Sequence, residues 1–116
     1  MGGAQRPIYV SVATAKTVVA TVQAEEIKLK CGAPTAPPPG MCVPKPLHDQ
    51  IQGYILEAAE YGQQVSLIMA SLPDGSPTPG QVIDLVAKIS ELLRKVMASL
   101  PKSPQADALQ AQLAGK

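Results

Sequence analysis

The chain has no phenylalanine and no tryptophan, and three tyrosines are its only aromatic residues. It also has no asparagine, one histidine and two cysteines. Any core must therefore be aliphatic, and the 46% content of hydrophobic residues is enough to build one. The absence of asparagine excludes N-glycosylation. At 116 residues, the chain has the length of one small domain.

A strong net charge is also missing, because the formal net charge is only +1 at pH 7. This balance argues against direct binding to a nucleic-acid backbone, which requires an excess of Lys and Arg. No uncharged apolar run reaches the roughly 18 residues of a membrane span. Residues 7–23 are the most apolar stretch, but they lack the continuous apolar segment of a secretory signal. The compartment stays open, with a virion or the cytoplasm favoured over a periplasmic or secreted location.

Residues 7–30 show the alternation that is typical of extended chain. The alternating β-branched residues are Ile8, Val10, Val12, Val18 and Val22. Such a period of two favours strands, so the sequence predicts an extended, β-type arm over residues 1–30. A helix over residues 10–24 is the alternative. Because a two-stranded ribbon is marginal in water, we expect the arm to dock on a neighbouring chain.

Proline is concentrated in residues 31–45, which are expected to form a connector of polyproline II and turns. Cys31 and Cys42 lie within this connector and could form a disulfide. Closing a loop of this length would stabilise the folded state by about 3 kcal/mol and would indicate an oxidising compartment. The alternative is a pair of reduced cysteines in a cytosolic protein.

From residue 46 onward the pattern becomes helical. The first run of apolar residues, alternately four and three apart, is Leu47, Ile51, Tyr54, Ala58, Tyr61, Val65, Ile68 and Leu72. The second run is Val82, Val86, Ile89, Leu93, Val96 and Leu100. This spacing predicts helices over residues 46–72 and 79–100, and the short link makes them an antiparallel hairpin.

The helix ends carry recognisable signals. Thr78 and Gln81 have the spacing of a capping box, so Thr78 is the expected N-cap of the second helix. Ser103 is the expected N-cap of a short third helix that opens with Pro104. The five letters Met-Ala-Ser-Leu-Pro occur at 69–73 and again at 97–101. Duplication of a helix–turn unit and independent use of one stop signal both explain this repeat.

The predicted fold class is therefore mainly α, with an arm at 1–30, a connector at 31–45 and a helical domain at 46–116. The hairpin has more apolar surface than its own contact requires. The short third helix can cover part of this surplus, and we expect the rest to contact the extended arm or another subunit. The valines of the arm are also expected to contact other chains. These interface candidates are Val10, Val12, Val18, Val22, Ile55, Met69, Ile83, Leu85, Leu92 and Met97.

The sequence offers few residues for catalysis or metal binding. His48, Cys31 and Cys42 could supply three zinc ligands, but their spacing matches no compact zinc module and a fourth ligand is missing. His48 is instead expected to be a polar group in the first turn of a helix. No Ser, Cys or Lys has a plausible His partner for nucleophilic catalysis. We therefore expect no catalytic residue, no metal and no cofactor, and we do not expect an enzyme.

These observations favour a non-catalytic structural subunit of a multi-chain assembly, for example a virus or phage particle. Its partners would be proteins, either copies of itself in a homo-oligomer or other chains of a larger complex. The main alternative is an extracytoplasmic adaptor or envelope protein, periplasmic or secreted, with a Cys31–Cys42 disulfide. A cytosolic helical regulator or chaperone is a further alternative.

Overall fold

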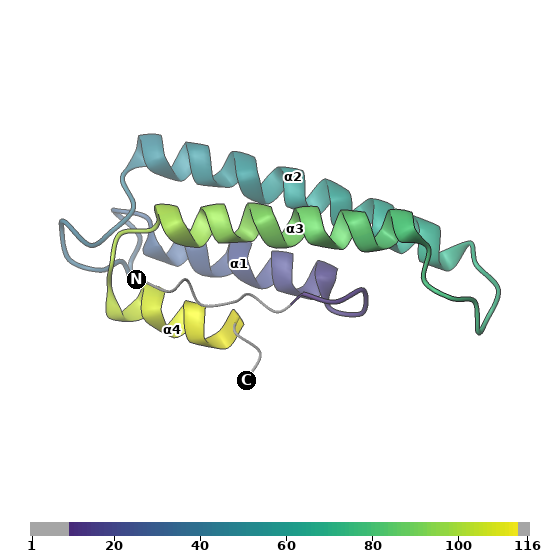
Figure 1. The fold of residues 1–116 in the computed structure, drawn as a ribbon. Helices are drawn as coiled ribbons and strands as arrows, with labels where there is room; N and C mark the ends of the chain where they lie inside the picture. The colour runs from purple at the N-terminus through teal and green to yellow at the C-terminus, as the bar shows by residue number, and fades with distance from the viewer. Residues whose placement is uncertain (1–9, 114–116) are drawn as a thin grey trace, which may run out of the picture.

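The structure, a computed structural model, describes residues 10–113, which fold into four helices (Figure 1). The helices are α1 (Ala15–Leu29), α2 (Lys45–Ala70), α3 (Gly80–Ser99) and α4 (Pro104–Leu113). The described residues contain no strand, and their only β feature is an isolated parallel bridge between Lys30 and Val43. The prediction of a mainly α fold is confirmed.

The two longest helices, α2 and α3, lie side by side and form the body of the molecule (Figure 1). Two surface contacts show their relative direction. Lys88 Nζ lies 5.6 Å from the ring centre of Tyr61, and Lys95 Nζ lies 5.8 Å from that of Tyr54. A step of one heptad backward along α2 thus corresponds to a step of one heptad forward along α3. The two helices therefore run in opposite directions.

The hydrophobic side chains that α2 and α3 bury in the core are all aliphatic. They are Ile51, Ile55, Ala58 and Val65 of α2, and Val82, Leu85, Ile89, Leu92, Leu93 and Val96 of α3. Each buried Leu, Ile or Val side chain contributes roughly 1.5–3 kcal/mol. Leu109 and Leu113 of α4 and the apolar face of α1 join the same cluster, so one continuous core unites the four helices.

α1 overturns the predicted β-type arm over residues 15–29, which are helical. The alternative prediction of a helix over residues 10–24 was correct in type, although the helix begins at Ala15 and ends at Leu29. The arm residues 1–9, including Ile8, lie outside the described part of the chain. α1 packs mainly on α2 and also contacts α3 and α4, so this segment belongs to the chain's own core.

The reason for this error lies in a second pattern within the same residues. The buried residues of α1 are Ala15, Val19, Val22, Glu26 and Leu29, alternately four and three apart. Strand preferences of Val and Thr span only about 1 kcal/mol, and burial of a helical face outweighs them. The helical pattern was hard to recognise because Glu26, a charged residue, occupies one of its core positions.

Of the two glycines within α2, Gly62 lies closer to α1. A Cβ atom at Gly62 would lie 3.5 Å from Lys16 Cγ and 4.0 Å from Lys16 Cα. A Cβ at Gly53 would meet nothing within 4 Å. The distances at Gly62 are those of ordinary van der Waals contact, so a Cβ atom would fit against Lys16 and no close approach within this chain requires a glycine there.

The predicted cap of α3 is wrong, whereas that of α4 is confirmed. The N-cap of α3 is Pro79, whose carbonyl accepts hydrogen bonds from Val82 N and Ile83 N at 3.0 and 3.2 Å. No side chain caps this helix, so the Thr78–Gln81 capping box does not form. In α4, Ser103 Oγ accepts a hydrogen bond from Ala106 N at 3.0 Å. Both Met-Ala-Ser-Leu-Pro copies end a helix, at α2 and α3.

Val65→Asp should destabilise the protein by about 3 kcal/mol or more, because it puts a carboxylate into a site with no polar partner. Val65 is 2% exposed and belongs to the buried core. The matched control is Gln64→Asp, one residue earlier on the exposed face of α2. Urea unfolding followed by circular dichroism measures both variants. Equal stability of the two variants would contradict the burial of the α2 face.

Candidate functional site

The connection between α1 and α2 leaves and re-enters the helical bundle at one point. Cys31 N donates a hydrogen bond to Val43 O at 2.9 Å, and Val43 N donates one to Leu29 O at 2.8 Å. Val43 and Leu29 are both buried in the core. These contacts fix the two ends of residues 31–42, which we call the closed loop.

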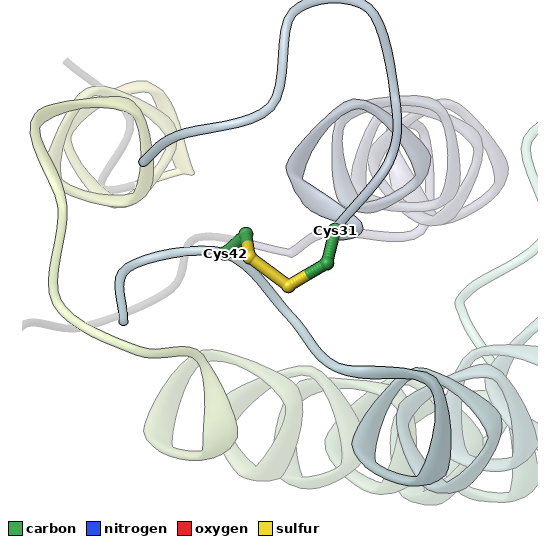
Figure 2. The surroundings of a disulfide bond; sticks show 2 residues. All are labelled: Cys31 and Cys42. Carbon is green, nitrogen blue, oxygen red and sulfur yellow. A yellow bond between two sulfur atoms is a disulfide. The ribbon is translucent and has the colours of Figure 1, made fainter. Parts of the chain in front are cut away.

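A disulfide between Cys31 and Cys42 also joins the ends of the closed loop (Figure 2). Their Cα atoms are 4.9 Å apart. In Figure 2, Cys31 follows directly after the ribbon of α1, and Cys42 lies on the segment that leads to α2. The disulfide, which the sequence offered as one of two alternatives, is thus present in the structure, and the described residues contain no free cysteine.

Turns shape the interior of the closed loop. Ala33 N donates to Lys30 O at 3.0 Å, and Met41 N donates to Pro38 O at 2.9 Å. Gly32 and Gly40 occupy the third position of these two turns with φ of 96° and 90°. A positive φ at this position is the requirement of a type II turn, which glycine meets without strain. The loop is therefore held by local hydrogen bonds at both ends.

The closed loop presents an uncharged, mainly apolar surface. It contains no Asp, Glu, Lys or Arg. Pro34, Pro38 and Pro39 are exposed, Met41 is 42% exposed, and Pro37 is buried. The exposed large apolar residues of the described chain are Ile27, Met41, Leu56, Leu67 and Ile83. Met41 is thus the only one of them that lies in a loop closed by a disulfide.

A buried carboxylate joins α1 to α2 at this end of the bundle. Glu26 is fully buried, and its Oε2 lies 2.8 Å from His48 Nδ1. Gln52 Nε2 donates to Glu26 Oε1 at 2.8 Å. These contacts satisfy both carboxylate oxygens, as a buried carboxylate requires. His48 therefore connects α2 to Glu26 of α1. The prediction that His48 is only a polar group in the first turn of a helix missed this contact.

The Glu26–His48 pair resembles the carboxylate–imidazole contact that orients a catalytic histidine, but it lacks the other parts of such a site. Catalysis would require a nucleophile or a substrate-holding group next to the imidazole. The hydrogen bonds of the described residues give His48 no side-chain partner except Glu26. No group of three His, Cys, Asp or Glu residues in this part of the chain could hold a metal. The contacts of Glu26 with His48 and Gln52 therefore connect α1 to α2.

Asp49, the next residue after His48, lies on the exposed side of α2 and forms an ion pair at the surface. Asp49 Oδ2 accepts a hydrogen bond from Lys45 Nζ at 2.9 Å at the surface. This hydrogen bond lowers the pKa of the Asp49 carboxyl group. Because both partners are exposed to water, the ion pair contributes little to stability.

The interface candidates from the sequence fall into three environments. Val22, Ile55, Leu85 and Leu92 are buried in the core of this chain. Val10, Val12, Val18, Met69 and Met97 are partly buried against that core, and Ile83 is 56% exposed. The buried residues could contact another chain only if the helices separated. The surplus apolar surface of the helical pair is covered mainly by α1, and α4 packs mainly on α1. The segment expected to be an extended arm thus covers part of this surface, as a helix of the same chain.

A shallow groove follows the contact between α1 and α2 near Gly62. Its lining residues are Lys16, Val19, Ala20, Gln23, Ala59, Gly62 and Gln63. Lys16 is its only titratable residue. The groove therefore offers no paired groups for acid–base chemistry.

Comparisons with protein-family models, with curated proteins and with solved structures find no match to this chain. None of the described helices combines the length and apolar character required to cross a bilayer. Any functional conclusion therefore depends on the residues themselves.

His48→Ala should destabilise the protein by about 1.5–3 kcal/mol, because it removes a hydrogen bond to a buried carboxylate. Asp49→Ala is the matched control, since it removes an exposed ion pair one residue away and should change stability little. Chemical unfolding of both variants at neutral pH provides the comparison. A His48→Ala variant as stable as Asp49→Ala would show that the Glu26 contact is not important for the fold.

Replacing both cysteines by serine should leave the helical content unchanged and lower the free energy of unfolding by about 3 kcal/mol. The physical reason is the larger conformational entropy of the unfolded chain without the cross-link. Circular dichroism in buffer and in urea measures both quantities. Loss of helix in buffer would contradict the conclusion that the core, and not the disulfide, holds the four helices.

Proposed function

We propose that this chain is a non-catalytic structural subunit that binds a second protein chain through the closed loop. The observation that carries the proposal is a disulfide that closes an exposed, uncharged loop displaying three prolines and Met41. The helical bundle would then serve as a rigid support for this loop.

The length of the connection supports a role beyond joining two helices. α1 ends at Leu29 and α2 begins at Lys45, so residues 30–44 link them. Connections between packed helices commonly have about 2–8 residues, and longer ordered loops are often functional. Val43 pairs with Leu29 and Cys31 where the loop returns, so residues 31–42 form an excursion that the helical packing itself does not require.

The rigidity of the closed loop also favours binding. Ordering a flexible segment on association costs conformational entropy, and a disulfide or a proline removes part of this cost in advance. In the closed loop, the disulfide, the prolines and the glycine-containing turns all restrict the backbone before a partner arrives.

The chemistry of the loop indicates the surface that it would contact. Proline rings and the thioether of Met41 pack well against aromatic and aliphatic side chains. The absence of charge within residues 31–42 provides no electrostatic steering from the loop itself. A partner protein with an apolar, aromatic-lined groove fits these properties. That partner could be another subunit of an assembly, including a viral one, or a second copy of this chain.

The disulfide also supports the second candidate function, an extracytoplasmic adaptor or envelope protein. Disulfides persist in oxidising compartments and are rare in the cytosol. Thiol quantification in denatured protein, with thiols blocked at the moment of cell lysis, tests the disulfide on which both candidates depend. Two free thiols per chain would contradict both candidates, because the covalently closed loop would then be absent.

Site-specific photocrosslinking in the cells that produce the protein tests the binding proposal. A photoreactive residue at position 41 should give one discrete crosslinked species, because this position lies on the closed loop. The control is the same residue at Asp74, an exposed position in the loop between α2 and α3 at the opposite end of the body (Figure 1). A product with twice the mass of the chain would identify a second copy as the partner.

Replacement of both cysteines should reduce crosslinking at position 41 severalfold, because the freed loop must be ordered on binding. Equal crosslinking from positions 41 and 74, or none from 41, would contradict the proposal.

A further inference from the structure

The two cysteines of the disulfide differ in their exposure to solvent. Cys31 is exposed, whereas Cys42 is 8% exposed and belongs to the buried residues. In thiol–disulfide exchange, an attacking thiolate must reach one sulfur and expels the other. We propose that Cys31 is a site of thiol–disulfide exchange, at which an external dithiol opens the Cys31–Cys42 bond while the helices stay folded.

The contacts that hold this end of the bundle do not involve sulfur. Cys31 N and Val43 O, and Val43 N and Leu29 O, are joined by backbone hydrogen bonds. Glu26 connects α1 to α2 through His48 and Gln52. The side chains of Val43 and Leu29 are buried in the core. Opening the disulfide therefore removes the covalent closure of the loop and leaves the helical packing in place.

The exchange requires a dithiol as reductant. Its first thiolate forms a bond with Cys31 Sγ, while the S–S bond breaks and Cys42 Sγ leaves with the electron pair and takes a proton. The second thiolate then attacks the reductant's sulfur in the mixed disulfide, and Cys31 Sγ leaves and is protonated. Two electrons and two protons pass to the cysteines, and the reductant becomes a disulfide.

The backbone favours the reverse reaction as well. The hydrogen bonds of Val43 keep the two cysteines adjacent after reduction. Reoxidation is then an intramolecular step with a high effective concentration of the second thiol. The disulfide thus acts as a reversible lock on the closed loop. Control of partner binding by this lock rests on the proposed function, but the exchange at Cys31 does not.

A trapping experiment on the purified oxidised protein tests the exchange. The probe is a Cys-x-x-Cys oxidoreductase whose second cysteine is replaced by serine, so that the mixed disulfide accumulates. Peptide mapping by mass spectrometry should place the probe on Cys31 at least about tenfold more often than on Cys42, because the thiolate must reach the attacked sulfur. Circular dichroism of the same sample should retain the full helical signal.

The urea-unfolded protein is the control, since both sulfurs are then accessible and the preference should disappear. Attachment mainly to Cys42, no adduct under native conditions, or an adduct that forms only as the helices melt would each overturn the proposal. No partner is present in this experiment, so its outcome is independent of the photocrosslinking result.

Discussion

Without phenylalanine and tryptophan, the protein depends on the long aliphatic contact between α2 and α3. Leu, Ile and Val side chains bury less area each than aromatic rings, so stability must come from many contacts over a long interface. The two helices supply this interface by lying side by side in opposite directions (Figure 1). α1 then covers apolar surface that the pair leaves exposed, and α4 packs mainly on α1. The elongated shape of the molecule, with extents of 51, 30 and 19 Å, is a direct consequence.

The contact of α1 with α2 combines this apolar packing with one buried polar group. Glu26 occupies a core position and is satisfied by His48 and Gln52. A buried carboxylate is costly unless it is paired, so sliding or rotating α1 along α2 would leave it without partners. Apolar contacts alone discriminate less strongly between neighbouring registers, because they lack direction. Glu26 therefore selects one position of α1, and that position brings Cys31 and Val43 together where the closed loop begins and ends.

The closed loop is the part of the molecule that the fold does not explain by itself. Leu29 and Val43 both belong to the core, and of the residues between them only Pro37 and Cys42 are buried, with Lys30, Ala33 and Ala36 partly buried. The sequence indicated part of this site, because Cys31, Cys42 and the prolines are visible as a pattern. It did not single out Met41, since exposure of one methionine depends on the path of the backbone. The role of Glu26 was also missed, because its partners are 22 and 26 residues away.

What the sequence determined by itself was the α2–α3 body. Their four-and-three spacing of apolar residues is local and regular, and it located both helices to within two residues at each end. The N-cap of α4 was equally local, because Ser103 and Ala106 are three residues apart. Only the tertiary structure decided that residues 15–29 are a helix. Their β-branched side chains prefer strands locally, but one face of this segment can be buried against α2 only as a helix. Burial between distant segments outweighs such local preferences, and no local pattern records which segments will meet.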